Sequence, residues 1–177
     1  MTEAALNQLP EADPAAIARA IVLRKLSASA KTRAELAKTL NERNVSAEIA
    51  NEVLDRFTEV GLIDDELYAA TFARSRHEYK GLSARAISYQ LAHKGVAKPE
   101  IETAVADISV EVELATAIKF AEKKLRSLRN VDQVKKLDRI VSFLARKGYS
   151  STICYRAAKS VLQADFELSE FDGVGSD

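Results

Sequence analysis

Apolar positions recur along the chain at steps of three and four residues, as in Leu36 and Leu40, and again in Ile140 and Leu144. This is the period of one face of an α-helix, and the sequence has no sustained alternation of the strand type. The pattern predicts an all-α protein, with helices near residues 15–27, 32–43, 46–60, 64–79, 83–94, 98–108, 110–128, 132–147 and 150–164.

Three segments repeat one pattern, in which an amphipathic helix is followed by a short turn and a second helix. The turns read ERNV, HKGV and RKGY, and the equivalent leucines Leu40, Leu91 and Leu144 are 51 and 53 residues apart. One further helix precedes each pair. The repeat therefore predicts three tandem three-helix repeats in an elongated, curved array, because each is too small to bury its own apolar faces.

The repeats divide the chain into five parts. We expect a flexible N-terminal segment at 1–15, repeats at 16–62, 63–109 and 110–164, and an acidic flexible tail at 165–177. Gly95 and Gly148 suit the left-handed residue that closes a helix, and Asn44 is the usual substitute for glycine at the first turn.

The stretch GLIDDELYAATFARSR, residues 61–76, places adjacent carboxylates that could mark a metal site or the start of a helix. Asp64 stands where an N-cap is expected, and Asp65 follows in the first turn, where negative charge meets the positive end of the helix dipole. Gly81 marks the turn that ends this helix. Metal-binding patterns such as HExxH or DxDxDG do not occur in the sequence. We interpret these carboxylates as structural.

Net charge is zero, but the charges are unevenly distributed. Residues 114–164 contain twelve Lys and Arg against three Asp and Glu, whereas residues 100–113 contain five acids and no base. The tail 165–177 also contains five acids and no base. This asymmetry indicates contact with a polyanion or an acidic protein surface, with a solvated helix face balanced by the tail as the alternative. We expect the tail to screen the basic repeat when no partner is present.

Other chemistry is poorly represented. A single cysteine, Cys154, excludes a disulfide framework and fits a buried core position, and His77 and His93 are isolated. The sequence has no phosphate-binding glycine loop and no apolar run long enough to span a bilayer. We therefore predict a soluble cytoplasmic protein that is not an enzyme, with no cofactor, no metal and no membrane contact.

The repeated turns, the GLIDDELYAATF motif and the following GLSARAISYQLAHKGV together resemble the RecX family of recombinase regulators. The resemblance covers about residues 16–164, with RNV at the first turn as a departure. It implies three tandem three-helix repeats that bind the RecA recombinase filament and inhibit its ATP hydrolysis, its extension and strand exchange, and so modulate recombination and DNA repair. No cofactor or bond-making chemistry is implied.

Basic side chains of the second and third repeats are the candidates for contact with the RecA filament or with single- or double-stranded DNA. Such contact would be weak and salt-dependent, and we expect a monomer. The candidates are Arg74, Arg76, Lys80, Arg85, Lys94, Lys123, Lys124, Arg126, Arg129, Lys135, Lys136, Arg139, Arg146 and Lys147.

Two other functions are compatible with an all-α basic protein. A helix-turn-helix DNA-binding protein should place Arg, Asn, Gln or Ser at the start of a recognition helix. The second helices here begin SAEIANEV, KPEIETAV and STICYRAA, and the first two are acidic, which argues against insertion into a DNA groove. A helical-repeat scaffold for another protein partner is the second alternative.

Overall fold

The structure, a computed structural model, describes residues 13–129 and 131–173, and every regular element in these ranges is a helix. The first module contains α1 (Pro14–Ala28), α2 (Arg33–Asn41) and α3 (Ala47–Glu59). The second contains α4 (Asp65–Lys80), α5 (Ala84–His93) and α6 (Lys98–Val105). The third contains α7 (Val110–Leu125), the short 3-10 helix η2 (Arg126–Leu128), α8 (Gln133–Arg146) and α9 (Ser151–Gly173). The predicted all-α class with three tandem three-helix repeats is confirmed.

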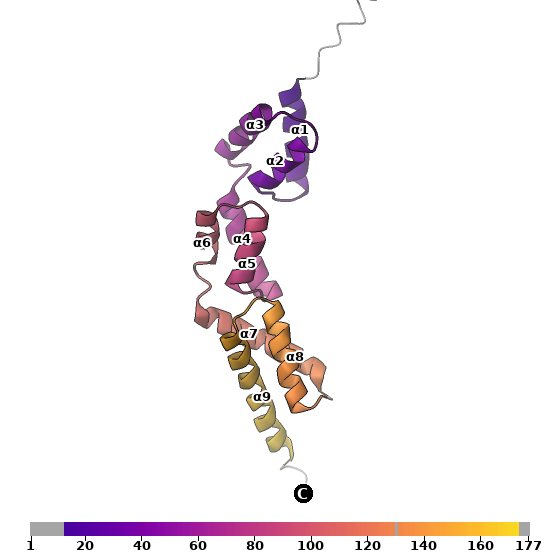
Figure 1. The fold of residues 1–177 in the computed structure, drawn as a ribbon, viewed down its shortest axis with the longest axis vertical. Helices are drawn as coiled ribbons and strands as arrows, with labels where there is room; N and C mark the ends of the chain where they lie inside the picture. Colours follow the sequence, from indigo (N-terminus) through magenta and orange to yellow (C-terminus); the bar gives the residue numbers. More distant parts are fainter. Residues whose placement is uncertain (1–12, 130, 174–177) are drawn as a thin grey trace, which may run out of the picture.

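The three modules follow one another along the long axis of the molecule, with the N-terminal module at one end and the C-terminal module at the other (Figure 1). Each module has its own apolar core. Leu36 and Leu40 are buried in the first, Ile87 and Leu91 in the second, and Ile140 and Leu144 in the third. These are the positions on which the helical period was recognised.

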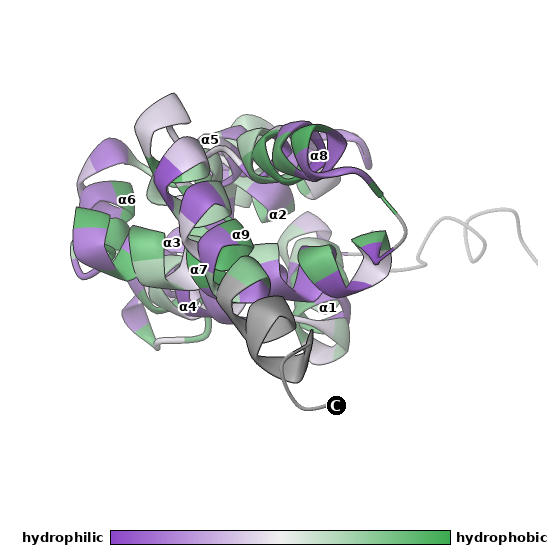
Figure 2. Ribbon diagram, turned by 90° about the horizontal axis from the view of Figure 1, so that it is seen from below, coloured by the Kyte–Doolittle hydropathy of each residue, from purple (hydrophilic) through white to green (hydrophobic). Residues whose placement is uncertain are grey.

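Seen along the long axis, each labelled helix carries both hydrophilic and hydrophobic residues (Figure 2). The apolar stripes of three short helices meet within a module, which is how an amphipathic helix becomes stable in water. Because the cores are separate, the arrangement of the modules depends on the contacts at the two junctions between them.

The last helix extends beyond its predicted end. We expected it to stop at residue 164 and to be followed by a flexible tail, but α9 continues to Gly173. The carboxylate of Asp165 accepts from Lys136 Nζ on α8 at 3.1 Å, so the first residue of the predicted tail is part of the third module. Most of the predicted N-terminal segment, residues 1–12, and residues 174–177 lie outside the described residues.

Candidate interaction surfaces

The first junction joins the start of α2 to the turn that follows α5. Thr32, the N-cap of α2, accepts from the amide of Glu35 at 3.1 Å and donates its hydroxyl hydrogen to the carbonyl of Lys94 at 2.6 Å. Gly95 has φ +77°, and a Cβ at this position would lie 2.3 Å from Ala34 Cβ. Glycine is therefore required here both by the backbone conformation and by the close approach of the first module.

Two charged contacts complete the first junction. The amide of Arg33 donates to Asp65 Oδ1 at 2.9 Å, and Lys94 Nζ binds Glu35 Oε1 at 2.7 Å. Burial raises the pKa of Glu35, but the hydrogen bonds from Lys94 and from the Thr32 amide outweigh it and hold the pKa below its usual value. The hydrogen bond to Glu35 raises the pKa of Lys94. Both directions describe an ion pair that favours the charged forms.

The second junction repeats this arrangement between the second and third modules. The amide of Ser83, the N-cap of α5, donates to the carbonyl of Lys147 at 3.0 Å, and the amide of Ala84 donates to Glu113 Oε1 at 2.8 Å. Gly148 has φ +92°, and a Cβ there would lie 2.5 Å from Ser83 Oγ. The second and third modules thus each place a turn and one carboxylate against the middle helix of the module before them.

The two junctions differ in the partner of their lysine. The position that Glu35 occupies in α2 is occupied by Ala86 in α5, so Lys147 has no carboxylate there. Its ammonium lies 4.6 Å from the ring centre of Phe120 and donates to the carbonyl of Lys80. Burial lowers the pKa of Lys147, and the nearby Lys123 and Lys80 lower it further.

The first turn differs from the other two because its left-handed residue carries a side chain. Asn44 has φ +59°, the conformation that Gly95 and Gly148 adopt, but it keeps a side chain. Asparagine tolerates the left-handed conformation, and its exposed side chain needs no close approach of another backbone. The departure from glycine at this turn therefore has a structural reason.

A buried histidine also joins the second module to the third. His77 Nδ1 lies 2.9 Å from the carbonyl oxygen of Leu82, and Nε2 lies 2.8 Å from Thr116 Oγ1 on α7. Because a carbonyl can only accept, Nδ1 donates to Leu82, and in the neutral ring Nε2 accepts from Thr116. The sequence showed His77 as isolated, since its partners come from other segments.

Five of the predicted contact residues are engaged within the protein. The Arg76 guanidinium lies 4.7 Å from the ring centre of Phe72, Lys124 lies 6.0 Å from that of Phe143, and Lys136 pairs with Asp165. Lys94 and Lys147 belong to the two junctions. These five side chains are half-buried, and their contacts stabilise the fold. The other candidates are exposed: Arg74, Lys80, Arg85, Lys123, Arg126, Arg129, Lys135, Arg139 and Arg146.

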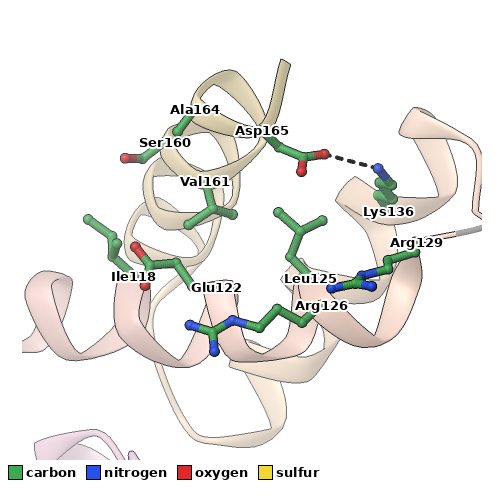
Figure 3. A pocket seen from close by; sticks show the side chains of 10 residues that line it. All are labelled: Ile118, Glu122, Leu125, Arg126, Arg129, Lys136, Ser160, Val161, Ala164 and Asp165. Carbon is green, nitrogen blue, oxygen red and sulfur yellow. Dashed lines mark hydrogen bonds and ion pairs between the residues drawn. The ribbon is translucent and has the colours of Figure 1, made fainter. Parts of the chain in front are cut away.

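Basic side chains line two hollows of the third module. One, of about 210 Å³, is lined by Lys124, Arg139 and Arg146 together with Asp138 and Ser142. The other, of about 360 Å³, is lined by Arg126, Arg129 and Lys136 together with Glu122 and Asp165 and is shown in Figure 3. Arg74, by contrast, lines a hollow of the second module beside three acids, Glu66, Glu78 and Asp107. The third module therefore offers the more positive surface.

An apolar groove between the first two modules was not anticipated. It has a volume of about 450 Å³ and is lined by Leu26 of α1, by Leu62 and Leu67, and by Tyr68 and Phe72 of α4. Leu62 and Leu67 are more than half exposed. Both exposed leucines lie in the stretch GLIDDELY, residues 61–68.

Other site types are not represented in the described part of the chain. No group of three or more His, Cys, Asp or Glu residues within 13–129 and 131–173 could hold a metal ion. Among the same residues, no helix is both long enough and apolar enough to cross a membrane. Cys154 is buried in the third core, and burial raises the pKa of its thiol.

Comparison with known proteins agrees with the modular fold. Family models described as the first, second and third three-helix domains of RecX match residues 18–57, 64–105 and 111–158. Regulatory protein RecX of Streptomyces coelicolor is 42% identical over 164 residues, which cover 93% of this chain and 87% of that protein. Regulatory protein RecX of Thermobifida fusca is 37% identical over 148 residues, covering 84% of this chain and 80% of that protein.

Two solved structures resemble the fold. A crystal structure described as regulatory protein RecX has a TM-score of 0.74 and 28% identity, and the match covers 90% of this chain and 80% of that one. The crystal structure of RecX from Lactobacillus salivarius also has a TM-score of 0.74, with 21% identity, 84% coverage of this chain and 97% of that one.

Proposed function

Because the chain belongs to the RecX family of regulatory proteins, we propose that it binds the RecA recombinase filament and inhibits its ATP hydrolysis, its extension and strand exchange. The observation that carries the proposal is the match of all three RecX domains, in order, to the three modules. A regulator of this kind needs a long contact surface and no reacting groups. An array of modules along one axis supplies such a surface (Figure 1).

The third module is the part best suited to contact the filament. Residues 114–164 carry an excess of nine positive charges, and six of its candidate cations are exposed. A surface of this sign attracts DNA phosphates and acidic protein surfaces, with an affinity that falls as salt rises. Lys124, Lys136 and Lys147 are engaged within the fold, but the six exposed cations remain accessible to a partner.

The test is the hydrolysis of ATP by RecA on single-stranded DNA, titrated with the full chain at two salt concentrations. We expect inhibition well below one chain per RecA monomer, because a regulator that blocks a filament acts on many subunits. A parallel titration with excess single-stranded DNA separates this from competition for the strand. No inhibition at any ratio, with RecA from the same organism, would overturn the proposal and favour a scaffold for another partner.

A charge-matched pair of variants locates the contact. The triple variant K123Q/R139Q/R146Q removes three exposed cations of the third module, and R24Q/K38Q/R43Q removes three exposed cations of the first. We expect the first variant to need a markedly higher concentration for half-inhibition and the second to behave like the wild type. Equal loss in both would show that only overall charge matters.

A further inference from the structure

The hollow of about 360 Å³ in the third module brings together side chains from four elements (Figure 3). Arg126 belongs to η2, Arg129 follows it directly, and Lys136 comes from the first turn of α8. Asp165, from α9, accepts a hydrogen bond from Lys136 at the edge of the hollow (Figure 3). Three cations thus line one concave site together with two carboxylates, Glu122 of α7 and Asp165 (Figure 3).

The short 3-10 helix explains why the two arginines act together. In a 3-10 helix, side chains three residues apart lie one above the other, and Arg126 and Arg129 have this spacing. Both are exposed, and neither forms an ion pair with another residue of the described chain. Two guanidinium groups three residues apart that form no ion pair within the described chain offer planar hydrogen-bond donors suited to phosphate oxygens.

Lys136 is the buried member of the set. Its side chain is 12% exposed, and its ammonium binds Asp165, whose side chain is 42% exposed, at 3.1 Å. The carboxylate of Asp165 is thus an internal anion already bound at the edge of the cationic hollow. Replacing it by an external anion would cost little new desolvation of Lys136, because the ammonium would exchange one anionic partner for another.

The apolar side chains that line the hollow indicate that the ligand has an apolar part as well as an anionic group. Ile118 and Leu125 of α7 and Val161 of α9 form an apolar wall beside the cations. A nucleotide combines a phosphate with the apolar faces of a sugar and a base, and matches both parts. The charge excess of residues 114–164 favours a ligand with many regularly spaced anions over a single carboxylate.

We propose that this hollow binds a backbone phosphate of single-stranded DNA through Arg126 and Arg129, with Asp165 as the internal anion that competes for Lys136. The inference deepens the proposed function, because it assigns the part of the chain that touches the DNA strand of a RecA filament. Its test contains no RecA, so its failure is distinguishable from failure of the proposed function.

The experiment measures the binding of a fluorescently labelled, mixed-sequence single-stranded oligonucleotide to the full chain by anisotropy. Salt is varied from about 50 to 200 mM. The variant R126Q/R129Q is compared with R24Q/R43Q, which removes two exposed arginines of the first module. Each phosphate contact contributes about 0.7 to the slope of log K against log salt for single strands.

We expect R126Q/R129Q to lower the slope by about 1.4 and to weaken binding about tenfold at low salt, while R24Q/R43Q leaves both nearly unchanged. D165N frees Lys136, so it should tighten binding and steepen the slope by about 0.7. Circular dichroism checks that each variant is folded, and the exposed arginine pair keeps the test valid if D165N is unstable.

Two results would overturn the proposal. If R126Q/R129Q and R24Q/R43Q bind the oligonucleotide equally well, the hollow is not a phosphate site. If R126Q/R129Q keeps its DNA affinity but no longer binds a glutamate-rich peptide that the wild type binds, the hollow takes protein carboxylates instead. An unchanged affinity in D165N would remove the competing role of Asp165.

Discussion

The backbone amide of Arg33 in the first module donates to the side chain of Asp65 in the second, at 2.9 Å. The same relationship joins the amide of Ala84 to Glu113 of the third module, at 2.8 Å. The first helix of each later module thus supplies a carboxylate to one of the free amides at the start of the preceding module's middle helix. Asp64 caps its own helix through the amide of Leu67, so neighbouring aspartates serve different modules.

Replacing Asp65 by alanine should destabilise the protein by about 1–2 kcal/mol, because the Arg33 amide loses its acceptor. Asparagine at the same position keeps an acceptor oxygen, so D65N should cost less than D65A. Denaturant unfolding measures both, and small-angle scattering reports whether the first two modules separate. An equal loss in both variants would show that the charge of Asp65, and not its hydrogen bond to Arg33, holds the junction.

The ion pair between Glu35 and Lys94 should give the first junction its own pH dependence. The lowered pKa of Glu35 stabilises the fold above the unfolded value near 4.5, and this contribution is lost as pH falls through the folded pKa. The raised pKa of Lys94 stabilises the fold below about 10.5, and this part is lost as pH rises through the folded pKa.

Unfolding free energies of the wild type and E35Q, measured from acid to alkaline pH, test this prediction. Their difference should be greatest at neutral pH and should shrink at both extremes. Burial raises the pKa of Asp65, which favours the fold as pH falls, but this effect is present in both proteins and cancels in the difference. A difference that does not vary with pH would contradict the pairing.

Much of the fold was predictable because it depends on local sequence. The helical period places Leu36, Leu91 and Ile140 in the cores, and a helix needs only its own residues to choose its apolar face. The end of α9 was predicted wrongly, because the acidic composition after residue 164 suggested a tail. The pair between Asp165 and Lys136, 29 positions apart, is not visible in that composition.

The candidate surfaces were less predictable, because burial by other helices decides whether a cation is available. Lys94, Arg146 and Lys147 look alike in the sequence, in the two similar basic turns HKGV and RKGY. The structure leaves Arg146 exposed and places the two lysines against aromatic rings at the junctions. The hydrogen bond from Thr32 to Lys94 joins residues 62 positions apart, so the helical period within one module does not predict it.

The two junction lysines should respond differently to replacement by methionine. K94M leaves the partly buried Glu35 carboxylate without its ion-pair partner, at a cost of about 1–2 kcal/mol. K147M loses a cation–π contact worth about 0.5–1 kcal/mol, but it also removes the cost of burying an ammonium with no carboxylate. We therefore expect K147M to change the free energy of unfolding by less than about 1 kcal/mol.

Alkaline pH separates these two variants further. The lowered pKa of Lys147 means that the fold disfavours its charged form, so wild type should gain stability over K147M as pH rises toward about 10.5. The raised pKa of Lys94 predicts that wild type loses its advantage over K94M as pH rises beyond that value. Differences of the same sign would contradict the proposed contrast between the junctions.

Two glycine substitutions separate the cost of the left-handed backbone from the cost of a steric clash between modules. Gly61 and Gly148 both have positive φ, but a Cβ at Gly61 meets nothing within 4 Å, whereas one at Gly148 lies 2.5 Å from Ser83 Oγ. G61A should therefore cost only the left-handed conformation, about 1–2 kcal/mol. G148A should add about 1–3 kcal/mol of overpacking, because Ser83 and Ala86 belong to a fixed helix start.

The measurement is the free energy of unfolding of both variants, together with small-angle scattering of the folded proteins. G148A should change the scattering profile, since the third module must move away from the second, and G61A should not. If the two variants lose equal stability and keep equal profiles, the turn of the third module does not lock onto α5 in solution. The array would then be flexible at this junction, and the basic third module would be free to change its orientation relative to the other two.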